Sequence, residues 1–210
     1  MKYTDLLKLV RERRSIRRFK IKPVSRELIE KILEVARWAP SGANSQPWKF
    51  IVVDESGLRK RISEILIHPT DGSRQTGFRD ASVFILVCGD SRTRLYYPFI
   101  DSEQQRNEVL ISSWANVFLY IQLATKALGL GSRWVSRVAR KQSEIKNLLG
   151  IPDVLEIYDM AAIGYPDEGK KTRLVRSLED LTHYNKYDLS RIKPEKDITD
   201  YVQKLRQSTR

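Results

Sequence analysis

The spacing of hydrophobic residues predicts helices and strands over most of the chain. Segments with apolar residues at helical spacing are interspersed with short runs rich in Val and Ile, which are typical of strands. The predicted helices are 3–13, 25–36, 57–67, 103–128, 142–149 and a short one near 198–205. The predicted strands are 49–53, 83–88, 132–138 and 156–164. The run 83–88 is apolar on both faces, so we expect it to be a central strand.

The segment 103–128 is hydrophobic on almost every face of its predicted helix. Val109, Trp114, Phe118 and Leu123 point in different directions around the helix axis. A helix that is apolar all round must be buried on all sides, and a domain of this size has little with which to cover it. We therefore expect a second copy of the chain to cover part of this helix in a homodimer.

The stretch ARWAPSGANSQPWKF, residues 36–50, ends a predicted helix at Pro40 and continues through small and polar residues. Small residues let a flat ligand approach the backbone closely. An ordinary connection between a helix and a strand would explain the tripeptide PSG alone. The full spacing, in which Asn44, Gln46 and Trp48 follow, is more particular and favours a ligand-facing loop.

The chain has 210 residues, which suits one domain with or without a terminal extension. Its formal net charge of +12 favours anionic partners, and nucleic acid, an acidic surface and a phosphorylated cofactor are all compatible with it. In RRSIRRF, residues 13–19, guanidinium groups surround the hydroxyl of Ser15 and could wrap a phosphate, although a solvated basic face is the alternative. Lys171 and Arg173 form a second cationic pair.

Several other classes of site find no support in the sequence. Gly129 and Gly131 resemble the start of a dinucleotide-binding loop, but Trp134 stands where the next glycine would be required. The two histidines have no metal-ligand spacing, so no metal site is predicted. Cys88 has no partner for a disulfide and is expected to be a buried thiol. No apolar run is long enough to cross a bilayer and no secretory signal is evident, which indicates a cytoplasmic protein.

Four stretches, taken in order, resemble the FMN-dependent nitroreductase family. They are RRSIRRF at 13–19, ARWAPSGANSQPWKFIVV at 36–53, ALGLGSRWVS at 127–136 and IGYPDEGKKTR at 163–173. The resemblance implies an α+β fold, a nitroreductase-like α-β-α sandwich with a mostly antiparallel central sheet, in an obligate homodimer with FMN at the subunit interface. It assigns residues 1–183 to the FMN-binding domain and leaves 184–210 as a C-terminal arm, which we expect to pack on the partner subunit.

The resemblance also implies which residues bind the cofactor. The FMN phosphate, ribityl chain and pyrimidine edge would be held by Arg13, Arg14, Ser15 and Arg17, with help from Lys171 and Arg173. The isoalloxazine ring would be lined, from the partner subunit, by Pro40, Ser41, Gly42 and Asn44. The ring face near N5 would be contacted by Trp134, Val135 and Ser136, with a backbone amide or the Ser136 hydroxyl donating to N5 in the catalytic step. Gln75, or alternatively Arg74, would contact the pyrimidine end.

The implied activity is that of an NAD(P)H-dependent FMN oxidoreductase. NADH or NADPH would pass hydride to flavin N5, and a nitroaromatic, quinone or similar small-molecule acceptor would then take the electrons in a ping-pong mechanism. The insert 90–107, with Arg94 and Tyr97, would shape the acceptor pocket or form a surface lid. Two alternatives stay open: a flavin-binding relative with dehalogenase or flavin-fragmenting activity, and a basic nucleic-acid-binding module, which lacks a recognised motif.

Overall fold

The computed structural model describes residues 2–72, 76–97, 100–169 and 173–208. The chain forms two compact units, residues 1–168 and residues 169–210, and each is described by itself. The boundary predicted at residue 183 falls within the second unit. None of the described helices combines the length and the hydrophobicity needed to cross a membrane.

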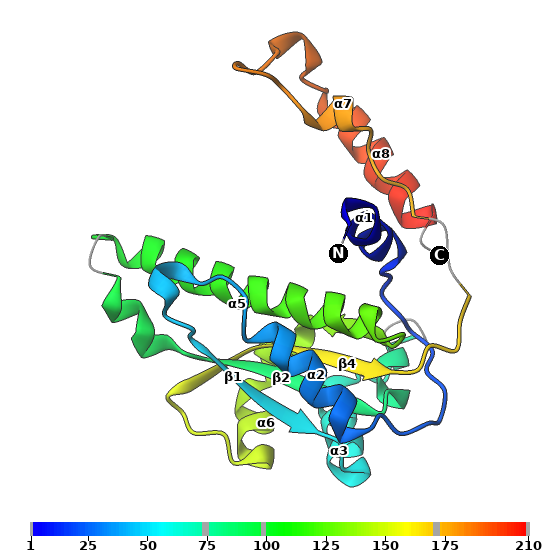
Figure 1. Ribbon diagram of the computed structural model, residues 1–210, viewed down its shortest axis with the longest axis vertical. Helices are drawn as coiled ribbons and strands as arrows, with labels where there is room; N and C mark the ends of the chain where they lie inside the picture. The colour runs from blue at the N-terminus through cyan, green and yellow to red at the C-terminus, as the bar shows by residue number, and fades with distance from the viewer. Residues whose placement is uncertain (1, 73–75, 98–99, 170–172, 209–210) are drawn as a thin grey trace. The chain divides into compact units, whose positions relative to one another are not determined.

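The first unit is built on a four-stranded sheet (Figure 1). The strands are β1 (Trp48–Val53), β2 (Val83–Asp90), β3 (Gly131–Val135) and β4 (Leu155–Gly164). Their order is β1-β2-β4-β3, and each neighbouring pair is antiparallel. β2 is buried over nearly its whole length, so the prediction that it is a central strand is confirmed. The mostly antiparallel sheet implied by the resemblance is confirmed as well.

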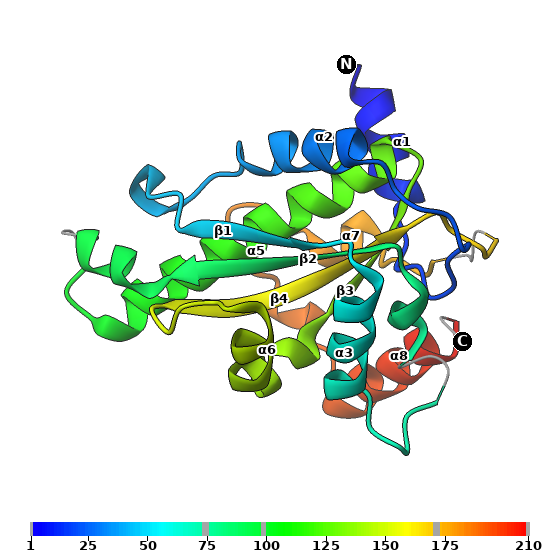
Figure 2. The same cartoon turned by 90° about the horizontal axis from the view of Figure 1, so that it is seen from below.

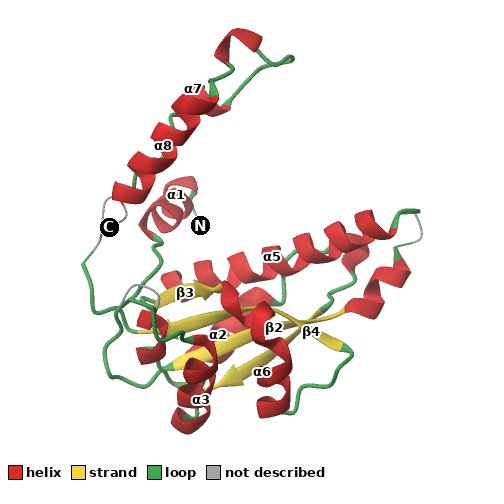
Figure 3. Ribbon diagram, turned by 180° about the vertical axis from the view of Figure 1, so that it is seen from behind, coloured by secondary structure: helices red, strands yellow, loops and turns green. Residues whose placement is uncertain are grey.

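Helices cover both faces of this sheet and make the α-β-α sandwich (Figures 2 and 3). On one face, α2 (Arg26–Ala36) and α5 (Glu103–Ala127) pack on Val83, Ile85 and Val87. On the other face, α3 (Ser56–Leu66) and α6 (Gln142–Leu149) pack on Phe84, Leu86 and Cys88. Successive side chains of β2 therefore point to opposite faces of the sheet and pack into two separate cores, as strand geometry requires.

The long helix α5 is buried on one side only within a single protomer. Phe118 and Ile121 face the core, whereas Ile111 is 50% exposed and Leu119 is 46% exposed on the outer side. At its C-terminal end α5 meets the first helix, α1 (Tyr3–Glu12), where Lys126 and Glu12 form an ion pair at 3.3 Å. The apolar outer side agrees with the pattern from which a homodimer was predicted, and the dimer itself stays a prediction.

The predicted strand 132–138 is too long. β3 ends at Val135, and Ser136–Lys141 forms a 3₁₀ helix, η4. The next pairing position on β4 would be Asp159, next to which the register between β4 and β2 shifts. The turn of η4 instead carries Val138 into the core below the sheet, where it is fully buried. The chain thus buries Val138 through a 3₁₀ turn and does not continue the pairing of β3 with β4 beyond Val135.

The second unit is small and helical. It contains α7 (Leu178–Leu181), the 3₁₀ turn η5 (Leu189–Arg191) and α8 (Glu195–Ser208), which is longer than the helix predicted near 198–205. The Arg191 guanidinium donates to the carbonyls of Thr182, at 2.9 Å, and Glu179. The Arg176 guanidinium lies 4.4 Å from the ring centre of Tyr201. Packing of this unit on a partner subunit stays a prediction.

Candidate functional site

The basic segment 13–19 runs beside β3. The N–H of Ile16 donates to the carbonyl of Ser132 at 3.0 Å, and Ser15 and Ser132 form a parallel bridge. Gly131 makes this approach feasible, because a Cβ there would lie 2.6 Å from Ile16 Cγ1. Two sets of predicted site residues, Arg13 to Arg17 and Trp134 to Ser136, are therefore held on one edge of the sheet.

The turn that follows β4 is tied to the same basic segment. The N–H of Arg17 donates to Glu168 Oε1 at 2.5 Å, and the N–H of Asp167 donates to the carbonyl of Arg18 at 2.9 Å. The sequence reasoning missed Glu168, whose carboxylate lowers the net positive charge of this cluster. Lys171 lies outside the described residues, and Arg173 belongs to the second unit, so the roles of both stay predictions.

The side chains of Arg13, Arg14 and Arg17 are half-buried, and this segment starts directly after the end of α1. Arg14 Nη1 donates to the Arg13 carbonyl at 2.8 Å and to the Arg11 carbonyl, which places its charge at the negative C-terminal end of α1. Arg17 Nη1 lies 3.4 Å from the Ser15 carbonyl, and Ser15 itself is exposed. Guanidinium groups that neighbour an exposed hydroxyl in sequence are groups that suit a phosphate, although Arg14 and Arg17 donate to backbone carbonyls in this structure.

The end of β3 presents alternate residues to opposite sides of the sheet. Val135 is buried in the core with α3 and α6, so its side chain is not available to a ligand and only its backbone could make contact. Trp134, on the face toward α5, is 37% exposed and stacks on Phe118 with ring centres 4.2 Å apart. Ser136 is exposed at the start of η4. Trp134 and Ser136 are thus the accessible side chains of this predicted set.

The loop 40–46 has an unusual backbone that α5 holds in place. Ala43, Asn44 and Gln46 have φ angles of 49°, 51° and 45°, in the left-handed region that non-glycine residues rarely adopt. The Ser113 hydroxyl accepts from the Gly42 N–H at 3.1 Å, and Asn116 Nδ2 donates to the Pro40 carbonyl at 3.2 Å. A strained loop held by surrounding contacts is a common feature of ligand sites.

Further contacts support this loop from the neighbouring segment. Ser45 and Tyr97 share a hydrogen bond between their hydroxyls at 3.0 Å, and the Ser41 hydroxyl accepts from the Gln46 N–H at 3.0 Å. The residues that the sequence reasoning missed here are Ser113 and Asn116, together with the loop-supporting contact of Tyr97. The available signal was the presence of polar residues inside an otherwise apolar helix.

The loop 40–46 and the basic segment occupy opposite corners of the sheet. Trp48, just after the loop, aligns with Gly89 and through it with Glu156 of β4, whereas Val135 aligns with Met160. Four residues along β4 and three strand spacings across the sheet correspond to roughly 20 Å between Trp48 and Val135. In one protomer, therefore, the two regions do not face the same ligand ring.

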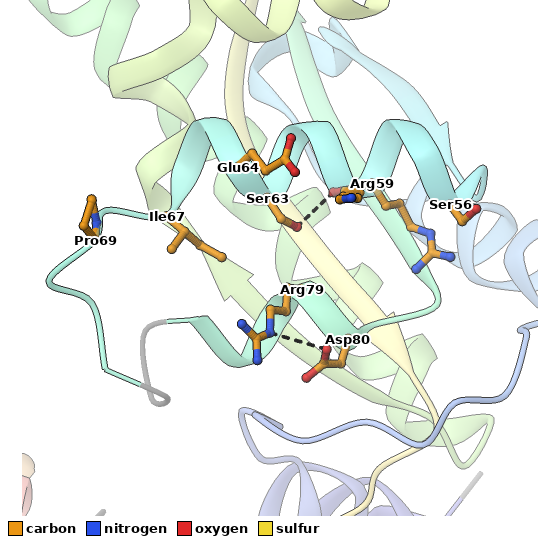
Figure 4. Close-up of a pocket in the computed structure, with 9 residues that line it drawn as sticks. Ser56, Arg59, Ser63, Glu64, Ile67, Pro69, Arg79 and Asp80 are labelled. Carbon is orange, nitrogen blue, oxygen red and sulfur yellow. Dashed lines mark hydrogen bonds and ion pairs between the residues drawn. The ribbon is translucent and has the colours of Figure 1, made fainter.

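A cavity of ≈ 610 Å³ lies elsewhere, between α3 and the 3₁₀ turn η2 (Gly77–Asp80) (Figure 4). Its lining mixes hydroxyl, cationic, carboxylate and apolar groups: Ser56, Arg59, Lys60, Ser63, Glu64, Ile67, Pro69, Arg79 and Asp80. Among the residues that the structure describes, none of those predicted to contact the flavin lines this cavity. A site assembled from two protomers need not form a cavity in one chain, so the size of this cavity does not displace the predicted site.

Gln75, and its alternative Arg74, lie outside the described residues, so contact with the pyrimidine end stays a prediction. Cys88 is buried, as expected, and burial raises the pKa of its thiol to about 11. In the part of the chain that the structure describes, no three His, Cys, Asp or Glu side chains gather where they could hold a metal ion.

Comparisons with known proteins support the fold and the motifs. A sequence model described as the Nitroreductase family matches residues 10–165. A protein of Archaeoglobus fulgidus named "Putative NADH dehydrogenase/NAD(P)H nitroreductase" is 34% identical over 168 residues, covering 79% of this chain and 88% of the relative. An "Iodotyrosine deiodinase" of Thermotoga neapolitana is 31% identical over 172 residues, covering 79% of this chain and 90% of the relative.

Solved structures show the same fold at lower identity. The NADPH:FMN oxidoreductase of Vibrio harveyi, complexed with NAD⁺, matches with a TM-score of 0.75 and 20% identity. The match covers 96% of this chain and 85% of the other. Similarity at this level of identity shows a shared fold and does not by itself establish a shared chemistry.

Proposed function

This chain belongs to the nitroreductase family, and we propose that it takes hydride from NAD(P)H through bound FMN and reduces a nitroaromatic, quinone or similar small acceptor. Family membership makes it an NAD(P)H-dependent oxidoreductase with FMN as its cofactor. The observation that supports the finer proposal is the bridge between Ser15 and Ser132, which holds the basic segment alongside β3, the strand whose exposed end carries Trp134.

The residues present fit an FMN molecule. At one end, Arg13, Arg14 and Ser15 offer guanidinium groups and a hydroxyl, which suit a phosphate dianion. Toward the other end, Trp134 and Ser136 are accessible on the same strand edge and suit an aromatic ring with polar atoms on its rim. The spacing from Ser132, which is bridged to Ser15, to Ser136 is four residues, roughly 13 Å along an extended chain.

When bound, FMN supplies the redox chemistry by accepting two electrons from NAD(P)H and releasing them to the acceptor in the same pocket. The protein's own residues would hold the cofactor in place and orient it. Arg17 is proposed to stabilise negative charge at the pyrimidine edge, because its guanidinium is fixed to the chain in this cluster. The Ser136 hydroxyl or a neighbouring backbone N–H would donate to the ring nitrogen at which hydride arrives.

The full site is proposed to require two copies of the chain. The loop 40–46 sits about 20 Å from the end of β3 in its own protomer. The same loop is fixed to α5, whose outer side carries the exposed residues Ile111 and Leu119. Pairing of two α5 helices would bury this apolar side, and we propose that it brings each loop to the other protomer's flavin.

The test is anaerobic reduction of the purified protein with NADH and NADPH separately, followed by reoxidation with a panel of acceptors. A yellow protein whose released chromophore is FMN, and whose flavin is bleached by at least one nucleotide, is the expected result. A flavin that neither nucleotide reduces would contradict the proposal. A colourless protein with steeply salt-dependent DNA binding would favour the nucleic-acid alternative.

Arg17→Ala tests the assigned role of that residue, with Arg18→Ala as its matched control. Arg18 is the exposed neighbour of the same charge. Removal of the Arg17 charge should lower the flavin reduction potential, since the positive group stabilises the reduced, anionic ring. The Arg18 variant should keep the wild-type potential. Equal potentials in the two variants would remove Arg17 from this role.

A second candidate function is reductive dehalogenation. It is favoured by the similarity to the Thermotoga neapolitana protein named "Iodotyrosine deiodinase" and by the exposed hydroxyl of Ser136 at the predicted ring nitrogen. The acceptor panel should therefore include an iodinated tyrosine, with release of iodide as the readout. Dehalogenation would become the leading proposal if the wild type releases iodide and Ser136→Ala abolishes that release but retains nitroaromatic reduction.

A further inference from the structure

Asp159 is a buried carboxylate on the face of the sheet that packs on α5. It is 7% exposed and pairs with Val87 across the β2–β4 ladder. The Trp134 indole Nε1 donates to Asp159 Oδ2 from the neighbouring strand β3. A carboxylate buried among apolar groups is costly unless it is hydrogen-bonded, so this indole contact is central to how the site tolerates the charge.

The Trp134 indole is held on two sides. Its ring stacks on Phe118 of α5, with centres 4.2 Å apart and planes at 32°, and it meets the ring of Tyr158 at 6.1 Å and 61°. The hydrogen bond to Asp159 fixes the remaining rotation of the indole in its plane. Trp134 keeps 37% of its surface exposed, next to the exposed Ser136.

We propose that Asp159 is a positioning residue of the flavin site, which fixes the Trp134 indole and places a buried negative charge behind the segment 134–136. This inference rests on the proposed function, because that proposal puts the flavin ring against this segment. Asp159 acts through Trp134 and the electric field, without touching the cofactor. Its charge opposes that of Arg17, so the two residues together set the flavin reduction potential.

The surroundings of Asp159 shift the ionisation of its carboxyl toward pH 6. Burial raises the pKa of the Asp159 carboxyl to about 6, and the Trp134 hydrogen bond opposes that rise. On the same strand, the pKa of Tyr158 is raised by burial and by the Asp159 charge. Its neighbours on β2 and β3 are Val87 and Trp134, and the α5 residue that contacts the Trp134 ring is Phe118; none of the three titrates.

The cation on β3 lies on the opposite side of the sheet. Arg133 places its guanidinium 5.7 Å from the ring centre of Phe78, a residue of the core formed with α3 and α6. Arg133 and Asp159 therefore lie on opposite faces of the sheet, and the Asp159 charge stands on the face that carries Trp134. Between pH 5 and 7 the negative charge behind segment 134–136 should grow as Asp159 ionises.

The experiment compares Asp159→Asn with Glu156→Gln, which removes an exposed carboxylate from the same strand. In the flavin-free protein, the Trp134 indole N–H resonance, assigned with Trp134→Phe, is followed from pH 4.5 to 8. It should shift with a midpoint near pH 6 in the wild type and in Glu156→Gln, and stay constant in Asp159→Asn. In the FMN-loaded proteins at pH 7, Asp159→Asn should have a higher midpoint potential than the wild type, and Glu156→Gln should not.

The outcomes separate this inference from the proposed function. The inference alone is overturned if the wild type binds FMN but has the same midpoint potential as Asp159→Asn. It is also overturned if the Trp134 indole resonance of the wild type does not shift with pH. A wild type that binds no FMN overturns both. If Asp159→Asn does not fold, Trp134→Phe replaces it in the potential measurement. That variant keeps the stack on Phe118 but lacks the N–H donor, so Asp159 should be less ionised at pH 7 and the potential should again rise.

Discussion

Replacing Ser113 by alanine should loosen the loop 40–46 from α5 and destabilise the protein. The buried Ser113 hydroxyl accepts from the Gly42 N–H at 3.1 Å and donates to the Val109 carbonyl at 2.7 Å. Without it, the Gly42 N–H loses its hydrogen bond, which costs about 1–3 kcal/mol for a buried donor. Gly42 is half-buried and water can replace part of the bond, so about 1–2 kcal/mol is expected.

The same change should affect the flavin more than the fold. Ala43, Asn44 and Gln46 hold left-handed backbone angles, each at a cost of roughly 1 kcal/mol, and a loosened loop would relax toward ordinary angles. If the loop lines the partner's flavin ring, as proposed, relaxation would withdraw it from that ring. We therefore expect weaker FMN retention in Ser113→Ala, measured as the fraction of FMN lost during dilution and filtration.

Ser112→Ala is the matched control for this prediction. The Ser112 hydroxyl also donates to the Val109 carbonyl, at 2.9 Å, but Ser112 is exposed. In a chain of this size, about 1–2 kcal/mol lowers the thermal midpoint by roughly 2–8 °C, whereas the control should change stability by about 0.5 kcal/mol at most. Both variants are melted at one protein concentration. Equal midpoints and equal FMN retention in the two variants would refute the reasoning.

Three further predictions concern the core. Gly89→Ala should lower the thermal midpoint strongly, since its Cβ would lie 1.8 Å from Trp114 Cζ2. Gly169→Ala, whose added Cβ would meet no atom within 4 Å, should leave the midpoint unchanged. Similar midpoints in the two variants would contradict the packing of Gly89 on Trp114. Native Cys88 should resist iodoacetamide at pH 8 and react once urea unfolds the chain, because burial keeps its thiol protonated and covered. Rapid labelling of Cys88 in the native protein would contradict its burial. Asp159 has a folded pKa of about 6, above its unfolded value near ~4, so its contribution to stability is present below pH 4 and is lost as the pH rises through 6. The wild type should therefore lose more thermal stability than Asp159→Asn between pH 4 and 7, and parallel curves would disagree with the burial.

The regular elements could be predicted because their patterns are strong. β2 is a short apolar run with β-branched and aromatic residues and α5 is a long segment with apolar residues around its axis, so length and residue type decide between strand and helix. The end of β3 was misjudged because Val138 fits a strand and a buried 3₁₀ turn equally well by its side chain. Only the register shift beside Asp159 decides between the two, and that shift depends on how β2 and β4 pair.

The candidate site was predictable as a set of motifs, but its supports were not. Nothing in the identity of Ala43 suggests a left-handed backbone, because alanine prefers other angles. The loop takes that shape through contacts with Ser113 and Asn116, about 70 residues away in sequence. Asp159 gave a weak signal as a carboxylate inside the apolar strand. Its partner, Trp134, becomes evident only when β3 and β4 are paired.

The helix α5 connects the parts of the site that lie far apart in one protomer. Its inner side supports the Trp134 indole through Phe118, and its N-terminal half anchors the loop 40–46 through Ser113. Its outer side carries the exposed Ile111 and Leu119, which a second α5 would cover. A shift of this one helix therefore moves the end of β3 and the loop together. If the flavin lies between the β3 end of one protomer and the loop of the other, subunit association and the geometry of the flavin site are coupled through α5, and weakening the outer side should loosen FMN before it unfolds the sheet.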